Sequence, residues 1–182
     1  NINQLPVITS WKTDGGPFVT LPLVYTEHPE LGIHNLGMYR IHVHDANTTG
    51  IHWQIHKGSG FHYVVSEKLN KPLPLNLYIG GPPALILSAI APLPENMPEL
   101  ILASLLYGKK IETVKNPKGG FNLIAEAEFA FVGEVRPFER KPEGPFGDHY
   151  GYNSLQHEYP VFHIKQAFHR KNAIYPATVV GK

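Results

Sequence analysis

The order of the predicted elements indicates an α+β protein that is mainly β. Strand patterns fill the beginning of the chain and return near its end, over residues 128–135, 159–168 and 173–179, and the helical patterns lie between them. Because the strands bracket the helices and do not alternate with them, we expect a mainly antiparallel sheet or barrel with a helical insertion. A chain of 182 residues with 42% hydrophobic residues suits one domain with a sizeable core.

Two strand patterns open the chain. Residues 18–25 are rich in β-formers, and Pro22 predicts an edge position or a bulge there. Residues 38–44 alternate between polar and apolar side chains, which is the period of a strand with one buried face. After a polar turn at 45–50, we expect the next strand over 51–56.

The first two predicted helices are delimited by small polar residues, glycine and proline. Ser59 is a suitable N-cap for a helix that runs to about residue 69, where Asn70 is the end signal. A short buried strand follows at 75–79. The run Gly80–Pro83 then opens the second helix, with proline at its start.

The third predicted helix has a start signal in two parts. Asn96 is expected to be its N-cap, and Glu99 stands three residues later, as in a capping box. Gly108 is the expected end. From the residues alone, Glu99 is therefore interpreted as a structural residue.

Composition excludes several classes of function. The formal net charge of +1 gives no strong field that would recruit nucleic acid. The absence of cysteine from the sequence excludes disulfides and thiolate metal sites, so a metal must use His, carboxylate, amide or water ligands. The apolar stretches are far shorter than the roughly 20 residues of a membrane helix. We expect a cytoplasmic protein without a membrane span.

The ends and the surface composition of the chain indicate that it belongs to a longer protein and contacts other domains or subunits. The first residue is Asn1, and both ends read as the middle of a domain, so we expect a segment of a longer protein. Charged residues make up 17% of the chain, a low share for a free surface. This favours contact with other domains or with a second copy in a homo-oligomer.

The segment 35–40 enters the first predicted hairpin. Asn35 offers an amide oxygen at a strand start, and Arg40 places a guanidinium within a strand. An asparagine turn followed by a surface arginine is the simpler interpretation. The alternative is a metal or phosphate ligand followed by an anion-binding arginine.

The returning strand carries a row of polar residues. His52, Gln54 and His56 share one face by period two, with Trp53 on the opposite face. This face is either a solvated strand surface or a polar pocket. The dipeptide Lys57–Gly58 then leads into a helix start, where backbone N–H groups and a lysine are suited to hold a phosphate.

The densest candidate segment is the loop at 142–149. Glu143 and Asp148 are five residues apart across Gly-Pro-Phe-Gly, a run without good helix formers that predicts a shaped loop. Two acids in a rigid loop suit acid–base chemistry if burial raises the pKa of one of them. The alternative is an ordinary turn with exposed acids.

Taken together, these segments resemble the UbiD family of decarboxylases from about Trp11 to Gly181. The resemblance rests on the runs NLGMYR, HWQIHKG, APLP, EGPFGDH and AIY…TVVG, which stand in that order at 35–40, 52–58, 91–94, 143–149 and 173–181. It implies a flavin-binding split β-barrel, flanked in full-length members by an N-terminal and a C-terminal domain. We therefore expect residues 1–182 to be a single domain, the cofactor-binding core of a longer decarboxylase.

The resemblance implies a divalent metal ion that bridges to the flavin phosphate. The ion is usually Mn²⁺, with K⁺ as an accompanying ion. The positions of its ligands correspond to Asn35, His56 and Glu99. Amide, imidazole and carboxylate groups are ligands that such a cation accepts. This reverses the structural interpretation of Glu99, and the reversal rests on the resemblance alone.

The organic cofactor that the resemblance implies is prenylated FMN. The residues that correspond to cofactor contacts are Met38, Tyr39, Arg40, His52, Trp53, Gln54, Lys57 and Gly58. The run Ala89–Pro92 corresponds to a less specific part of the flavin pocket. Some family members carry Arg at the positions of His52 and Lys57, so this chain departs from the pattern there.

The reaction that the resemblance implies is non-oxidative decarboxylation of an aromatic or unsaturated carboxylic acid, such as a polyprenyl-hydroxybenzoate in quinone biosynthesis. The catalytic residues correspond to Arg40, Glu143 and Asp148. We expect Arg40 to pair with Glu143 and to orient the substrate carboxylate, with the flavin as the electron sink. Asp148 is expected to protonate the carbon that has lost CO₂.

Two other interpretations compete with this one. A plain FMN-binding split-barrel oxidoreductase would share the fold but would need neither the metal ligands nor the paired acids. Alternatively, the isolated domain is inactive and serves folding or oligomerisation, because in the family the C-terminal domain completes the active site. A peripheral association with a membrane is compatible with each of these interpretations.

Overall fold

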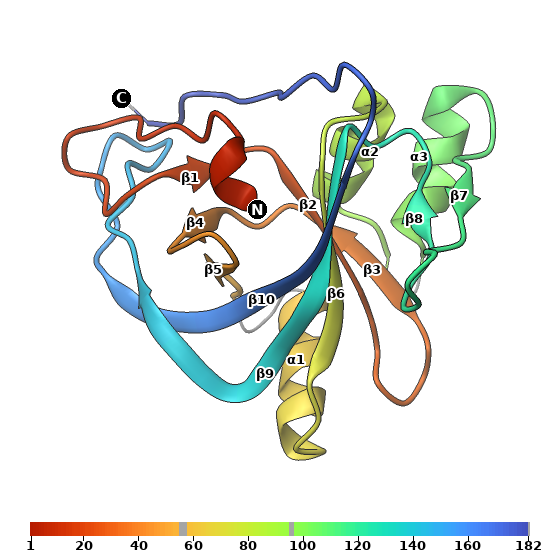
Figure 1. Cartoon of the computed structure of the whole chain (residues 1–182), viewed down its shortest axis with the longest axis horizontal. Helices are drawn as coiled ribbons and strands as arrows, with labels where there is room; N and C mark the ends of the chain where they lie inside the picture. Colours follow the sequence, from red (N-terminus) through yellow and green to blue (C-terminus); the bar gives the residue numbers. More distant parts are fainter. Residues whose placement is uncertain (55–57, 95–96, 182) are drawn as a thin grey trace.

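The computed structural model describes residues 1–54, 58–94 and 97–181, and its main feature is one large antiparallel sheet (Figure 1). The strands of this sheet have the order β1-β4-β5-β10-β9-β6-β2-β3. Their bounds are Phe18–Val19 (β1), Pro22–Glu27 (β2), His34–Gly37 (β3), Ile41–Val43 (β4), Thr48–Ile51 (β5), Leu73–Ile79 (β6), Phe129–Glu143 (β9) and His157–His169 (β10).

The remaining elements are helices and a small second sheet. The bounds are Ile2–Gln4 for a 3₁₀ turn, η1, and Gly58–Lys68 (α1), Pro83–Ile90 (α2) and Glu99–Tyr107 (α3) for the α-helices. The small sheet pairs β7 (Thr113–Val114) with β8 (Leu123–Ile124). Helix α1 packs against β2, β3, β6 and β9, whereas α2 and α3 pack against each other and against β3. The expected α+β class with a helical insertion between strands is confirmed.

The first predicted strand is divided between distant parts of the sheet. β1 pairs with β4, whereas β2 lies between β6 and β3 at the other end of the sheet. Pro22 is the first residue of β2 and stands opposite Ile79. The prediction that Pro22 marks an edge strand or a bulge was therefore wrong. A proline is tolerated as the first residue of an inner strand because no ladder hydrogen bond needs its missing N–H there.

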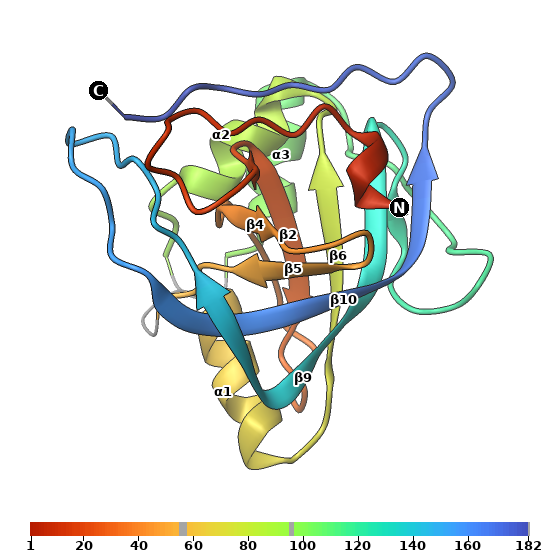
Figure 2. The ribbon, with the colours of Figure 1, turned by 60° about the vertical axis from the view of Figure 1, so that its left-hand side comes forward.

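The two longest strands bend strongly, and this gives the sheet its curled shape (Figures 1 and 2). The register between β9 and β10 shifts between Pro160 and Phe162 and again between Ile164 and Gln166, as at β-bulges. The curled sheet keeps two edges, β1 and β3, in the described part of the chain. The mainly antiparallel sheet is thus confirmed, and a closed barrel is not found among these residues.

The curled sheet encloses one hydrophobic cluster, and a second lies between the sheet and helices α2 and α3. β6 contributes to both clusters, because Leu75 and Leu77 belong to the first and Tyr78 to the second. The predicted apolar face of segment 38–44 also packs into the first cluster. Its members there are Tyr39, Ile41 and Val43.

The helix ends confirm some of the predicted signals and correct others. Asn70 has a positive φ of 50° just after α1, and Gly108 has a φ of 75° after α3, as expected for residues that end helices. Ser59, however, is a buried residue inside α1 and not its cap. Helix α3 begins at Glu99 with Pro98 at the N-cap position, so it starts later than predicted. The predicted cap Asn96 lies outside the described residues.

Three predicted strands are shorter than expected or missing. Residues 38–40 and 52–54 lie outside β4 and β5, which pair over only a few residues. The prediction of a strand at 173–179 was wrong. This segment runs along the N-terminal segment (Figures 1 and 2), where Thr178 N–H donates to Thr20 Oγ1 at 3.0 Å and the Trp11 Nε1–H donates to the Val180 carbonyl at 2.7 Å.

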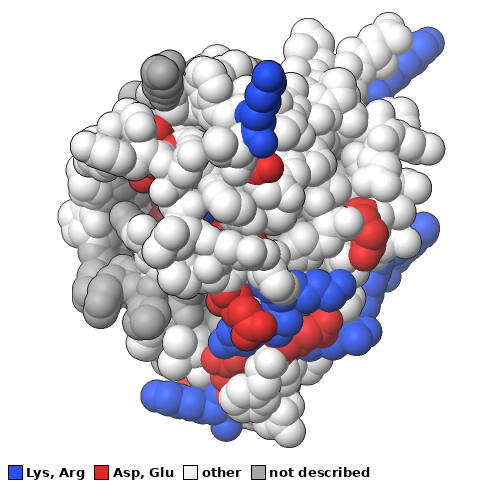
Figure 3. All heavy atoms as spheres, turned by 90° about the vertical axis from the view of Figure 1, so that its left-hand side faces the viewer, with Lys and Arg blue, Asp and Glu red and all other residues white. Residues whose placement is uncertain are grey.

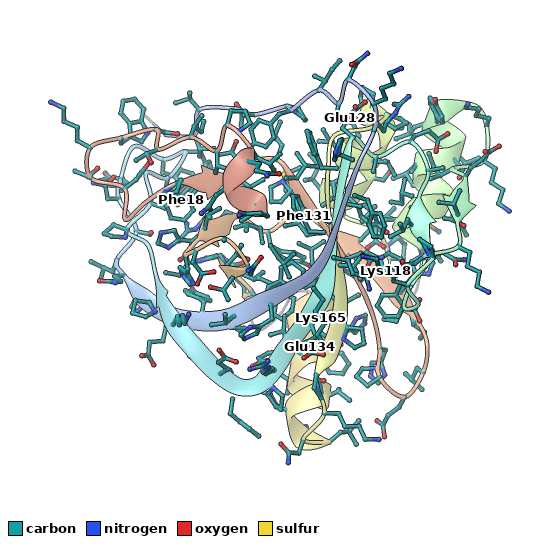
Figure 4. All side chains as sticks on the ribbon, in the orientation of Figure 1. Phe18, Lys118, Glu128, Phe131, Glu134 and Lys165 are labelled. Atoms are coloured by element: carbon teal, nitrogen blue, oxygen red, sulfur yellow. The ribbon has the colours of Figure 1, made fainter. Side chains whose placement is uncertain are left out.

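Charged side chains are unevenly distributed over the surface. Figure 3 shows acidic and basic side chains next to each other in the lower part of one face, and few of them elsewhere on that face. Ion pairs of this kind link the two long strands. Lys165 Nζ, for example, lies 2.5 Å from Glu134 Oε2 (Figure 4). None of the helices in the described ranges is long and apolar enough to cross a lipid bilayer.

The bend of β9 yields a first prediction. A Cβ atom added at Gly133 would lie 1.9 Å from the backbone oxygen of His163, so the two strands approach too closely for a side chain. Gly133→Ala should therefore lower the free energy of unfolding by about 1–3 kcal/mol. Denaturant unfolding would measure this, with Gly50→Ala as the control, since a Cβ there would meet only side-chain atoms at 3.2–3.4 Å. An equal loss in both variants would contradict the argument.

Candidate active site

A cleft of about 690 Å³ brings together segments that are far apart in the sequence. It lies where the ends of the short strands, the end of α2 and the loop after β9 meet. Its lining residues are Thr20, Asn35, Gly37, Met38, Tyr39, Arg40, His52, Gln54, Gly58, Ala89, Ile90, Ala91, Pro92, Leu93, Glu99, Phe146, Asp148, His149 and Val180.

The strongest polar interaction at the cleft is an ion pair with two parallel hydrogen bonds. Arg40 donates from Nε to Glu143 Oε1 at 2.7 Å and from Nη2 to Glu143 Oε2 at 2.9 Å. This geometry fixes the plane of the guanidinium. A further hydrogen bond goes from Arg40 Nη2 to Ser154 Oγ at 3.2 Å, and the guanidinium stacks over the ring of Phe146. The predicted pairing of Arg40 with Glu143 is confirmed.

Glu143 is fully buried and has a second partner in His52. Nδ1 of His52 lies 3.2 Å from Oε2 of the carboxylate. Burial alone would raise the pKa of Glu143, but the hydrogen bonds from Arg40 and His52 outweigh it and lower the pKa to about 2. Glu143 is therefore a carboxylate at neutral pH, where it orients Arg40 and has no proton to donate.

Asp148 lies at the other end of the short loop that follows Glu143. It lines the cleft and is partly exposed, and its carboxylate contacts the ring of His149. One acid of the loop is thus buried and ionised, whereas the other faces the cleft. This arrangement suits one acid that orients Arg40 and another that transfers a proton, and it does not suit two acids with the same role.

A carboxylate from the N-terminal segment holds this loop in place. Oδ1 of Asp14 accepts a hydrogen bond from Gly147 N–H at 2.9 Å, and Oδ2 accepts from Ser10 N–H and Trp11 N–H. A Cβ at Gly147 would lie 2.5 Å from Cδ1 of Trp11, so the loop and the N-terminal segment pack too closely for a side chain there. Asp14 therefore fixes the loop that carries Asp148.

Asn35 and Glu99 both line the cleft, one from β3 and the other from α3. Glu99, the first residue of α3, accepts a hydrogen bond at Oε2 from the Leu36 N–H of β3 at 3.0 Å. Its carboxylate therefore bridges to the neighbouring strand, and the local capping-box interpretation is replaced by this contact. Asn35 lies next to Leu36 in β3, with its amide oxygen against Gly58, where a Cβ would come within 2.0 Å.

Most of the predicted site residues line the same cleft. They are Asn35, Met38, Tyr39, Arg40, His52, Gln54, Gly58, Glu99 and Asp148. Glu143 and Trp53 are exceptions. Glu143 is fully buried and paired with Arg40, and the ring of Trp53 is buried in the first hydrophobic cluster against Tyr63. His56 and Lys57 lie outside the described residues.

Three residues of the site were not predicted individually from the sequence. Asp14 and Ser154 act through hydrogen bonds to residues more than a hundred positions away, which no local pattern indicates. Phe146 lies within the acid loop and stacks under Arg40. Its position between the two acids could have marked it as part of the site.

The described residues contain no cluster of three His, Asp or Glu side chains that could hold a metal. The predicted ligand set differs from such a cluster, since it combines an amide, a carboxylate and His56. The first two of these groups line the same cleft. Their oxygen donors are those that a hard divalent cation prefers.

Comparison with known proteins assigns the chain to a family. Residues 1–182 match the family UbiD, described as 3-octaprenyl-4-hydroxybenzoate carboxy-lyase Rift-related domain. The chain belongs to the UbiD family.

One relative with a functional name is a 4-hydroxybenzoate decarboxylase component from Chlamydia pneumoniae. It is 53% identical to this chain over 182 residues, which are 100% of this chain and 31% of that protein. The chain thus spans about a third of the length of the curated relatives that it matches.

Two solved structures of this class resemble the chain closely in fold. The UbiD-class enzyme HmfF from Pelotomaculum thermopropionicum, in complex with prFMN, has a TM-score of 0.92 at 28% identity and covers 97% of this chain and 41% of its own. The vanillic acid decarboxylase of Sedimentibacter hydroxybenzoicus, in its closed form, has a TM-score of 0.93 at 29% identity. It covers 98% of this chain and 39% of its own.

The buried carboxylate predicts a pH dependence of stability. Since the pKa of Glu143 falls from 4.5 to about 2 on folding, this group stabilises the fold above about pH 4.5, and the stabilisation is lost as the pH falls toward 2. Glu143→Gln cannot titrate, so its free energy of unfolding should fall less steeply between pH 4.5 and 2. Denaturant unfolding in pH steps tests this, with the exposed Glu112→Gln as a control that keeps the wild-type slope. Equal slopes for Glu143→Gln and the wild type would refute it.

Proposed function

We propose that this chain is the cofactor-binding core of a decarboxylase that removes CO₂ from an aromatic or unsaturated carboxylic acid. The proposed cofactors are prenylated FMN and a divalent metal, with Mn²⁺ as the first candidate. The observation that carries the proposal is the meeting of the Arg40–Glu143 pair, Asp148, Asn35 and Glu99 around one cleft. Membership of the UbiD family supports it over a plain FMN oxidoreductase.

In the proposed mechanism Arg40 binds the substrate carboxylate. Its guanidinium is held in one plane by Glu143 and lines the cleft, where a carboxylate can approach it. Because Glu143 stays ionised, it balances the charge of Arg40 and keeps its orientation. Fixing the guanidinium in this way lowers the entropic cost of orienting the substrate.

Proton transfer is the proposed role of Asp148. When CO₂ leaves, the electron pair of the broken C–C bond stays with the substrate and is later used to bind a proton. When bound, prenylated FMN would supply the electron sink for this pair. Asp148 lines the cleft and is the loop acid that is not held by Arg40, so it can deliver the proton to that carbon.

The residues of the cleft fit a divalent cation beside the flavin phosphate. Asn35 and Glu99 offer an amide oxygen and a carboxylate from adjacent elements, and the resemblance adds His56. The backbone at Gly58 approaches the Asn35 side chain so closely that a larger residue there would have to displace the amide. We propose that these groups bind the metal, which would neutralise the phosphate of the cofactor.

The proposed binding fold is the split barrel that the family resemblance implied. Its support is the curled antiparallel sheet, together with the similarity of this chain to the UbiD-class enzyme HmfF, whose structure contains prFMN. The relatives are named for hydroxybenzoate and vanillic acid decarboxylation. A hydroxylated benzoic acid is therefore the substrate class that we propose to test first.

Removal of the proposed proton donor is the test of the mechanism. In the intact protein loaded with prenylated FMN, Asp148→Asn should lower turnover of a benzoic acid substrate by about 100-fold or more, because general acid catalysis typically contributes 10²–10⁴-fold. Flavin affinity should stay unchanged. Asp45→Asn, in an exposed turn, is the matched control. Normal turnover in Asp148→Asn would remove Asp148 from the mechanism.

Removal of the proposed metal ligand tests the cofactor site. FMN binding to the intact protein should be strengthened by Mn²⁺, and Glu99→Gln should abolish this effect because a neutral amide holds the cation less well. Quenching of flavin fluorescence, with and without Mn²⁺, measures it. Glu112→Gln, an exposed acid, should behave like the wild type. Flavin binding that is indifferent to Mn²⁺ in the wild type would favour the plain flavin domain.

A further inference from the structure

A buried chain of hydrogen bonds leads from the interior to Asn35. Nδ1 of His62 lies 2.9 Å from Oγ1 of Thr26, and the Thr26 hydroxyl donates to Oγ of Ser59 at 3.0 Å. The Asn35 amide donates from Nδ2 to the same Ser59 oxygen at 2.9 Å. The chain therefore links β2, α1 and β3 and ends at a side chain of the cleft.

The members of this chain are removed from solvent. Thr26 and Ser59 are completely buried, and His62 is 5% exposed. Burial, together with the neighbouring His28 and His34, lowers the pKa of His62 to about 4, so its ring is neutral at pH 7. A buried polar group destabilises the fold unless it is hydrogen-bonded. A buried network in which every member is hydrogen-bonded holds these side chains in one arrangement.

The network holds the nitrogen of the Asn35 amide. Nδ2 of Asn35 donates to Ser59 Oγ and also to Tyr39 OH at 3.3 Å, so the nitrogen side of the planar amide is held by the protein. The amide oxygen then lies on the opposite side, against Gly58, and both residues line the cleft. Without these acceptors the amide could rotate and present its N–H₂ group, which repels a cation.

We propose that Ser59 is a positioning residue, supported by Thr26 and His62, that holds the Asn35 amide with its oxygen toward a divalent cation. This inference rests on the proposed metal site and adds the buried residues that give this site its geometry. Outer partners of metal ligands typically change metal affinity by about 10–100-fold when they are removed. Removal of the Ser59 or the Thr26 hydroxyl should change the metal affinity by a factor in this range, although neither residue touches the cation.

The test measures Mn²⁺ binding and not turnover. Mn²⁺ is titrated into the intact protein in the presence of FMN, and the free ion is followed by its electron paramagnetic resonance signal. Ser59→Ala and Thr26→Val should weaken binding by about 10-fold or more, whereas Thr26→Ser, which keeps the hydroxyl, should bind nearly as well as the wild type. The control is Ser66→Ala on the same helix, whose buried hydroxyl donates to the Lys71 carbonyl away from the cleft.

The variants separate this inference from the proposed function. If Asn35→Ala weakens Mn²⁺ binding but Ser59→Ala and Thr26→Val bind normally, the positioning role is wrong and the metal site stands. If Asn35→Ala itself binds Mn²⁺ normally, the metal site is wrong and the inference falls with it. Should Ser59→Ala fail to fold, the comparison of Thr26→Val with Thr26→Ser still decides the question. Equal affinity in that pair would overturn the role.

Discussion

The ion pair between Arg40 and Glu143 is the interaction on which the candidate site depends. A fully buried carboxylate is tolerated only when it is paired and hydrogen-bonded, and Glu143 has both Arg40 and His52 as partners. The pair also joins the segment between β3 and β4 to the end of β9, 103 positions further along the chain. The same contact therefore closes the fold at this point and fixes the guanidinium that faces the cleft.

The curled sheet makes this contact possible. β9 and β10 bend across the molecule, and the loop after β9 reaches the cleft beside the short strands β4 and β5. The Asp14 carboxylate holds this loop from the N-terminal side, and the segment near Val180 crosses the same region. Stretches that are far apart in the sequence thus contribute to a site that no single element could form.

Local patterns in the sequence predicted features that depend on neighbouring residues. The period-two alternation placed Tyr39, Ile41 and Val43 in the core, and Gly108 and Pro83 marked helix ends correctly. These features follow from backbone conformation and from which face is apolar, and both can be read over a few residues.

Local patterns did not predict features that depend on distant partners. Glu99 was first interpreted as a capping residue, and its real partner, the backbone of Leu36, is 63 positions away. The expected strand at 173–179 has β-forming residues but lies along the N-terminal segment, where Thr20 binds the backbone of Thr178 and Trp11 binds that of the following Val180. Among the site residues, the family resemblance supplied the groupings, since spacing alone could not show that Asn35 and Glu99 share a cleft.

A crystal structure of the intact protein with FMN and Mn²⁺ would test the central claim most directly. Anomalous scattering at the manganese edge locates the ion independently of the interpretation of the electron density. We predict a manganese peak between the flavin phosphate and the side chains of Asn35 and Glu99, with the flavin in the cleft beside Arg40. A flavin bound elsewhere, or a flavin in this cleft without manganese at these two residues, would contradict the account.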